Sequence, residues 1–234
     1  MTFPPRNPKE RLPFADVPDP LAAAGSVEEF ALPALEASRE SGPTRAELRR
    51  RWSFSLGFCA VWLLAQILVF GVRKAWSELP AGYFVPLVMV PLLAAGLSLG
   101  LARAGGRLGL GLRASSLGVW GAFALLLPVA LGFGLTPPAA MTGTFRNHLV
   151  CVLMVLGWSA PPLVVLGSAV RRSFAAQAEL RGAHVAAAAG LLAATLANLH
   201  CALVESAHVA LAHGLPVTAV AVLGALFVAP RARS

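Results

Sequence analysis

The sequence predicts an all-α polytopic membrane protein: a bundle of six transmembrane helices preceded by a largely disordered N-terminal cytoplasmic tail. The first observation is composition, because 57% of the 234 residues are hydrophobic, 13% are charged, and the mean hydropathy is +0.71. Soluble domains average about 45–50% apolar and about 25% charged residues. The second observation is a series of six runs without charged residues, at 53–72, 79–102, 114–145, 147–170, 182–204 and 206–230.

Each run is long enough to cross a bilayer. A helix of about 20 residues, rising 1.5 Å per residue, spans a hydrocarbon core of about 30 Å. Buried helices of soluble proteins are seldom so long or so uniformly apolar. We therefore predict a transmembrane domain over residues 45–230, with helices at about 45–72, 80–102, 114–135, 148–170, 183–203 and 208–229.

A Pro-rich, acidic segment precedes the first run, and we predict a tail over residues 1–44. Residues 1–42 contain seven acidic and four basic side chains, a composition that buries too little apolar surface to fold alone. Ser26 and Glu29 have the spacing of a helix capping box, so this part is either unstructured or a short motif that orders on a partner. The side chains expected to contact that partner are Phe30, Leu32, Leu35, Glu28 and Glu29.

A second capping box, Thr44 with Glu47, predicts that the first helix begins about six residues before the lipid. Trp52 follows where interfacial aromatic residues anchor a helix. The helix is therefore expected to carry a short collar of charged residues on its cytoplasmic side.

The basic residues around the runs predict the orientation. Cytoplasmic loops of membrane proteins carry an excess of Lys and Arg. Twelve basic residues fall on one predicted side, and only Arg73, Lys74 and Arg146 fall on the other. Both termini are therefore expected in the cytoplasm. Lys occurs only at Lys9 and Lys74, and this preference for Arg is typical of a GC-rich bacterial genome.

Several classes of function are disfavoured. The basic residues border apolar runs rather than forming a separate basic domain, so direct nucleic-acid binding is not expected. Proton-coupled transporters need an acid within the membrane. Beyond residue 47 the only acids are Glu78, Glu179 and Glu205, in predicted loops or at helix ends. We predict that the protein is not an enzyme, with a membrane thiol or quinone redox protein or a small transporter as the alternatives.

Polar and sulfur-containing side chains gather at one predicted face. The fourth helix begins and the fifth helix ends on the non-cytoplasmic side, so four of the five histidines and two of the three cysteines are expected there. The predicted sensing group is His148, Cys151, His200, Cys201, Glu205, His208 and His213. Polar side chains are costly in or near lipid, so their concentration indicates a candidate functional site.

Three chemistries remain open for this group. Thiolate and imidazole are ligands for soft or borderline metal ions such as zinc, copper or cadmium. The expected ligands are Cys151, Cys201, His200 and His208. The two cysteines would instead form a disulfide in an oxidising periplasm if their Cα atoms come within about 7 Å. They would otherwise pack as small buried hydrophobes. No permanent cofactor is expected, and a soft metal ion would bind transiently.

The end of this region resembles a known family. The letters LHC at 199–201 precede the pattern S-x-H-x-x-x-x-H-G-x-P over 206–216 and an apolar sixth helix. Together with six helices, an internal N-terminus and a lone cysteine in the fourth helix, this pattern resembles the six-helix membrane anti-sigma factors of the NrsF type. The similarity in layout covers about residues 45–230, and the specific motif covers 199–216.

The resemblance implies that the protein holds an extracytoplasmic-function (ECF) sigma factor at the inner membrane and releases it under metal or oxidative stress. The positions that match the family's membrane cysteine pair and its neighbouring histidines are Cys151, Cys201, His200, His208 and His213. The chain departs from the family in its longer, more acidic tail, and it has Ala202 and Glu205 where an acidic-Pro turn is expected. An acidic tail suits such a partner, because the sigma surfaces that bind DNA are basic.

The predicted orientation is tested by fusing a reporter after Ser234. A fluorescent protein that folds only in the cytoplasm should be active there, because the distribution of basic residues places the C-terminus inside the cell. Alkaline phosphatase activity at the same position, which requires export, would contradict the orientation.

Overall fold

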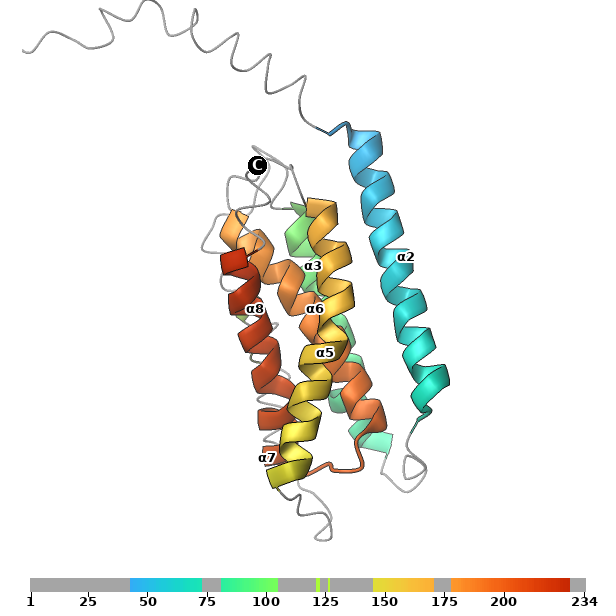
Figure 1. Ribbon diagram of the computed structural model, residues 1–234, viewed down its shortest axis with the longest axis vertical. Helices are drawn as coiled ribbons and strands as arrows, with labels where there is room; N and C mark the ends of the chain where they lie inside the picture. Colours follow the sequence, from blue (N-terminus) through green and yellow to red (C-terminus); the bar gives the residue numbers. More distant parts are fainter. Residues whose placement is uncertain are drawn as a thin grey trace, which may run out of the picture. The chain divides into compact units, whose positions relative to one another are not determined.

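The computed structural model describes residues 43–72, 81–104, 121–122, 126, 145–170 and 178–227, all within one compact unit, Pro43–Ser234. Every regular element in these residues is helical, which confirms the all-α prediction for them. The elements in chain order (Figure 1) are α2 (Arg45–Phe70), the 3₁₀ turn η2 (Ala81–Tyr83), the π-helix η3 (Val85–Met89), α3 (Val90–Ala104), α5 (Phe145–Val170), α6 (Ala178–His200), α7 (Ser206–His208), the π-helix η4 (Val209–Gly214) and α8 (Leu215–Phe227).

Five of these helical stretches are long and apolar enough to cross a membrane: Arg45–Phe70, Val85–Arg103, Phe145–Val170, Ala178–His200 and Ser206–Phe227. They indicate a membrane protein. The predicted helix at 114–135 lies outside the described residues, apart from positions 121, 122 and 126, which are helical. The predicted tail also lies outside them, apart from Pro43 and Thr44.

The start and end of α2 follow from its cap residues. The backbone N–H of Glu47 donates to Thr44 Oγ1 at 3.2 Å, as the capping box predicts. The Glu47 carboxylate pairs with Arg51, one turn further along the same helix. Gly71 ends the helix with a φ of 73°, a left-handed conformation that favours glycine, and its N–H donates to the Ile67 carbonyl.

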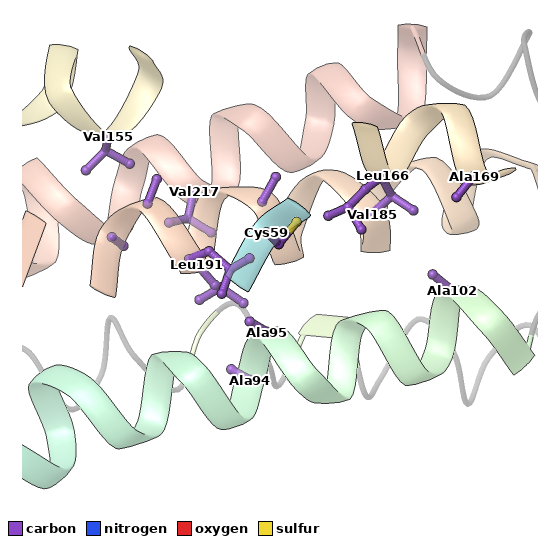
Figure 2. Packing of buried hydrophobic residues seen from close by; sticks show 14 of the residues in the cluster. Cys59, Ala94, Ala95, Ala102, Val155, Leu166, Ala169, Val185, Leu191 and Val217 are labelled. Atoms are coloured by element: carbon purple, nitrogen blue, oxygen red, sulfur yellow. The ribbon is translucent and has the colours of Figure 1, made fainter. Parts of the chain in front are cut away.

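Helix α6 lies at the centre of the described bundle and is buried along nearly its whole length. It packs against α3, α5 and α8, and more weakly against α2. Its interior turns are rich in alanine, which lets neighbouring helices approach closely without polar contacts. Figure 2 shows side chains from α3, α5, α6 and α8 meeting in this core, with Cys59 of α2 among them.

Helices α6 and α8 approach each other closely and run antiparallel. A Cβ on Gly224 of α8 would lie 2.1 Å from the Ala186 Cβ and 2.6 Å from the Gly182 carbonyl oxygen of α6. A Cβ on Gly190 would lie 3.2 Å from the Val217 Cα. Glycine at these two positions therefore sets the separation of the two helices that carry the polar motif at their adjoining ends.

Polar contacts join α2, α3, α5 and α6 near the end of the bundle where α2 begins. The Arg181 Nε of α6 donates to the Ala102 carbonyl of α3 at 2.7 Å. The Arg103 guanidinium lies over the Trp52 ring of α2, 5.8 Å from its centroid. Ser55 Oγ of α2 donates to the Val165 carbonyl of α5 at 3.1 Å. Helix α2 therefore contacts both α3 and α5 through polar groups near its N-terminus.

The role of the α6–α8 approach is tested with Gly224→Ala. The new methyl group overlaps the α6 backbone, so the helices must separate, and we expect a loss of about 1–3 kcal/mol in the free energy of unfolding. Thermal unfolding in detergent, followed by tryptophan fluorescence, measures the change. Gly96→Ala on α3 is the matched control, because among the residues that the structure describes its added Cβ meets no neighbouring atom from outside the local helix backbone within 4 Å. Equal unfolding midpoints for the two variants would contradict the close approach.

Candidate functional site

Four side chains form a compact group between the ends of three helical segments. Cys151 comes from α5, Cys201 from the connector after α6, His208 from α7 and His213 from η4. Each residue offers one potential ligand atom, a cysteine sulfur or a histidine ring nitrogen, and these four atoms all lie within 4.8 Å of one another. We call these four residues the Cys–His group.

The chain forms this group because α6 and α7 are joined by a short connector. The backbone N–H of Cys201 still donates to the Ala197 carbonyl at 2.8 Å, which continues the last turn of α6. Glu205 is the N-terminal cap residue of α7, and it makes no side-chain capping hydrogen bond. Only five residues separate α6 from α7, so Cys201 and His208 must lie near each other at the same end of the bundle.

The π-helix η4 explains how two histidines five positions apart share one face. In an α-helix of 3.6 residues per turn, positions i and i+5 point in different directions. A π-helical turn has i→i+5 hydrogen bonds and takes in more residues, so these positions come closer together. The rings of His208 and His213 are 5.0 Å apart between centroids and meet edge to face. Both side chains are fully buried.

Cys201 contacts both another cysteine and a histidine of the group. Its sulfur lies 3.6 Å from the Cys151 sulfur and 3.2 Å from His208 Nε2, and it accepts a hydrogen bond from the Leu203 N–H at 3.4 Å. The two cysteines are therefore neighbouring thiols rather than a disulfide, whose sulfurs would be about 2.05 Å apart.

Cys201 lies between two membrane-spanning stretches, and its surroundings favour the thiolate. The hydrogen bond with Cys151 lowers the pKa of the Cys201 thiol, burial raises it, and the His208 and His213 side chains lower it further, with a net decrease. The thiolate is the form of cysteine that binds metals and attacks oxidants. Cys201 is therefore the residue of the pair best prepared for either chemistry.

His148 extends the group by one ring. Its Nδ1 lies 2.9 Å from the Nδ1 of His208, and the two ring centroids are 4.6 Å apart. One of these nitrogens carries the proton and donates a hydrogen bond to the other. With its Nδ1 engaged in this way, His208 presents Nε2 to the Cys201 sulfur.

The other predicted site residues have different surroundings. His200 lies outside the Cys–His group, with its ring centroid 5.9 Å from that of Phe70 and 5.2 Å from that of Trp158. It therefore joins the end of α6 to α2 and α5 through aromatic contacts. The five predicted partner-binding residues, Phe30, Leu32, Leu35, Glu28 and Glu29, lie outside the described residues.

Asn198 is a polar residue at the site that the sequence interpretation did not single out. It is buried in α6, its Nδ2 donates to the Leu87 carbonyl at 2.7 Å, and its Oδ1 contacts His213 Nδ1. The sequence contains an indication of this role, because an amide lies three residues before Cys201 in a mainly apolar run. The sequence does not indicate its hydrogen-bond partners, because Leu87 lies more than 100 residues earlier in the chain.

The Cys–His group fits a soft or borderline metal ion. With a Zn–S bond of about 2.3 Å, two sulfurs in a tetrahedral site lie about 3.8 Å apart. The observed separation is 3.6 Å. Two thiolates and two imidazoles are also a ligand set that zinc and related ions accept. The buried His213 Nε2 makes no hydrogen bond with the residues that the structure describes, which leaves its lone pair for a ligand.

The family comparison covers both the described helices and the residues of this group. A family model described as "Negative regulator of sigma F" (NrsF) matches residues 35–233, well over half of the chain. This range includes the five apolar helices and all members of the Cys–His group. Neither the curated proteins nor the solved structures yield a match to this chain. The resemblance seen in the 199–216 motif is thus confirmed, and the chain belongs to the NrsF family of negative regulators of a sigma factor.

Proposed function

We propose that this protein is a bacterial inner-membrane anti-sigma factor that holds an ECF sigma factor through its cytoplasmic segments. It releases the sigma factor when the Cys–His group binds a soft metal ion or is oxidised at the periplasmic face. The observation that carries this proposal is the convergence of four ligand atoms within 4.8 Å in a member of a sigma-regulator family. Membership of that family also favours this function over a redox protein or a transporter.

The metal-responsive state uses the chain's own ligands. Cys151, Cys201, His208 and His213 would hold an ion of the zinc, cadmium or copper class, which supplies a positive charge and preferred bond lengths when bound. Ligand atoms near the 4.8 Å limit must approach each other by about 1 Å to share one tetrahedral ion. Such an approach draws α5, the connector after α6, and η4 together.

The oxidative state uses the neighbouring thiols. The Cys201 thiolate attacks a peroxide oxygen, the O–O bond breaks, and the products are a sulfenic acid and water or an alcohol. The Cys151 thiol then loses its proton and attacks the Cys201 sulfur, the S–O bond breaks as the disulfide forms, and the hydroxide takes up that proton and leaves as water. The pair loses two electrons to the peroxide. The sulfurs must close from 3.6 Å to about 2.05 Å, which moves the same end of α5 toward α6.

Helix α5 provides a path from this group to the partner-binding side. It carries Cys151 near one end, and near its other end the Val165 carbonyl accepts the Ser55 hydroxyl of α2. A shift of α5 against α6 therefore changes a contact close to where α2 continues into the N-terminal tail. A difference of about 3 kcal/mol between the two states in affinity for the sigma factor changes its release by more than a hundredfold.

The proposed contact with the sigma factor is made by the N-terminal tail. Its acidic residues complement a basic DNA-binding surface of a sigma factor, and Phe30, Leu32 and Leu35 supply apolar anchors beside Glu28 and Glu29. Blocking that surface prevents transcription without any direct contact between this protein and nucleic acid.

Sensing is tested by replacing both cysteines of the group, Cys151→Ser and Cys201→Ser, in the full-length complex with its sigma factor. Cadmium or peroxide should release the sigma factor from the wild-type protein and leave it bound to the double variant, because serine neither binds soft metals well nor forms a disulfide. Co-purification before and after treatment measures release. Cys59→Ser, in the hydrophobic core of the bundle, is the matched control and should respond like wild type. Release from the double variant at the wild-type level would remove the sensing role.

Partner binding is tested by replacing Phe30, Leu32 and Leu35 together with alanine in the full-length protein. We expect at least a tenfold weaker affinity for the sigma factor, since interface anchors of this kind each cost about 1 kcal/mol or more when truncated. Leu12, Phe14 and Leu21, replaced together by alanine, form the control with similar loss of apolar surface. If both triple variants bind equally, the anchors lie elsewhere.

A further inference from the structure

Asn198 connects two segments of the site through both ends of its side-chain amide. The Leu87 carbonyl can only accept a hydrogen bond, so the atom that contacts it at 2.7 Å must be the donating Nδ2. The other end, Oδ1, can only accept, and it faces His213 Nδ1. These contacts fix the orientation of the amide and require that His213 carries its proton on Nδ1.

The protonation of Nδ1 determines what the rest of the ring can do. In a neutral imidazole with a proton on Nδ1, Nε2 has a free lone pair. His213 is 1% exposed, and its Nε2 makes no hydrogen bond with any described residue. The ring belongs to the Cys–His group, so this lone pair is available where the two sulfurs converge.

The sequence around Leu87 explains why its carbonyl is available to a side chain. In a regular α-helix this carbonyl would accept the N–H of residue 91, and that residue is Pro91, which has no N–H. The π-helix η3 (Val85–Met89) includes Leu87, so the local backbone already departs from α-helical hydrogen bonding. Asn198 supplies a donor that the proline cannot.

In both histidines of the Cys–His group, Nδ1 contacts a polar side chain outside the group, which leaves Nε2 for contacts within it. The Nδ1 of His208 is engaged by His148, and its Nε2 points to the Cys201 sulfur at 3.2 Å. The Nδ1 of His213 is engaged by Asn198. Outer partners that hold one ring nitrogen commonly select the tautomer and orientation in which the other nitrogen binds a metal.

We propose that Asn198 is a positioning residue that holds His213 as the Nδ1-protonated tautomer, presents its Nε2 to the two cysteines, and ties the Cys–His group to η3. Its effect on metal affinity rests on the function proposed above, whereas its effect on the tautomer does not. Asn198 thereby adds η3, and α3 after it, to the elements joined at the site.

The tautomer is tested on the full-length, metal-free protein in lipid nanodiscs by nitrogen NMR of ¹⁵N-labelled histidine. The ring nitrogens of His213, assigned by their loss in His213→Gln, should show a protonated Nδ1 and an unprotonated Nε2. Asn198→Leu should lose this preference, and Asn198→Asp should keep it, because a carboxylate oxygen still accepts from Nδ1. Thr195→Val is the matched control on α6, since the Thr195 hydroxyl donates to the Leu191 carbonyl of its own helix.

The same four proteins are then titrated with cadmium, followed by the ultraviolet absorbance of thiolate–cadmium bonds. We expect a 10- to 100-fold weaker affinity for Asn198→Leu, and values within a few-fold of wild type for Asn198→Asp and Thr195→Val. A wild-type His213 protonated on Nε2, or an Asn198→Leu protein with unchanged tautomer and affinity, would overturn the proposal. If Asn198→Leu does not fold, the His213 tautomer in the wild-type and Asn198→Asp proteins still tests the proposal, because protonation on Nε2 in either protein would overturn it.

The outcome separates this inference from the function on which it rests. The expected tautomer in wild type, lost in Asn198→Leu, together with no cadmium binding by any protein, would support the positioning role and overturn the metal-sensing proposal. Tight cadmium binding by wild type with the opposite tautomer would support metal binding and overturn the role of Asn198.

Discussion

The burial of α6 is the constraint on which the rest of the described structure depends. Four other helices contact it, and its alanine-rich surface together with Gly224 of α8 lets them approach closely. Within a bilayer the hydrophobic effect does not drive helices together, so such close packing supplies much of the attraction. Because α6 ends at His200, directly before Cys201, and carries Arg181 in its first turn, its position also determines where both polar regions of the bundle lie.

Proline and π-helical turns provide the polar connections in this otherwise apolar domain. Lipid offers no hydrogen bonds, so each buried polar group must find its partner inside the protein. The Leu87 carbonyl, four residues before Pro91, is matched to Asn198, and η4 turns His213 toward His208. Departures from α-helical geometry therefore occur beside the Cys–His group on two of the helices that contact α6, at η3 before α3 and at η4 before α8.

These features are what the proposed mechanism needs, in which a signal on one side of a membrane changes partner binding on the other. The Cys–His group spans three segments, so any chemistry that shortens its distances changes how the helices pack. Close-packed helices rearrange between discrete arrangements rather than deforming continuously. The contact between Ser55 and the Val165 carbonyl, together with the stacking of Arg103 on Trp52, places α2 among the elements that such a rearrangement affects.

Local sequence properties predicted the helical class, the motif resemblance indicated the family, and residue type pointed to most members of the candidate Cys–His group. Runs of apolar residues predict helices because lipid leaves few alternatives, and the capping box at Thr44 set the start of α2 where the structure has it. Cys151, Cys201 and His208 were recognised by residue type and by their place at helix ends. Spacing did not select His213 over His200 as the fourth member, because that choice depends on the π-helical turn of η4. Spacing in the sequence also did not predict the contacts of Asn198, since hydrogen bonds between residues far apart in the chain exist only once the helices have packed.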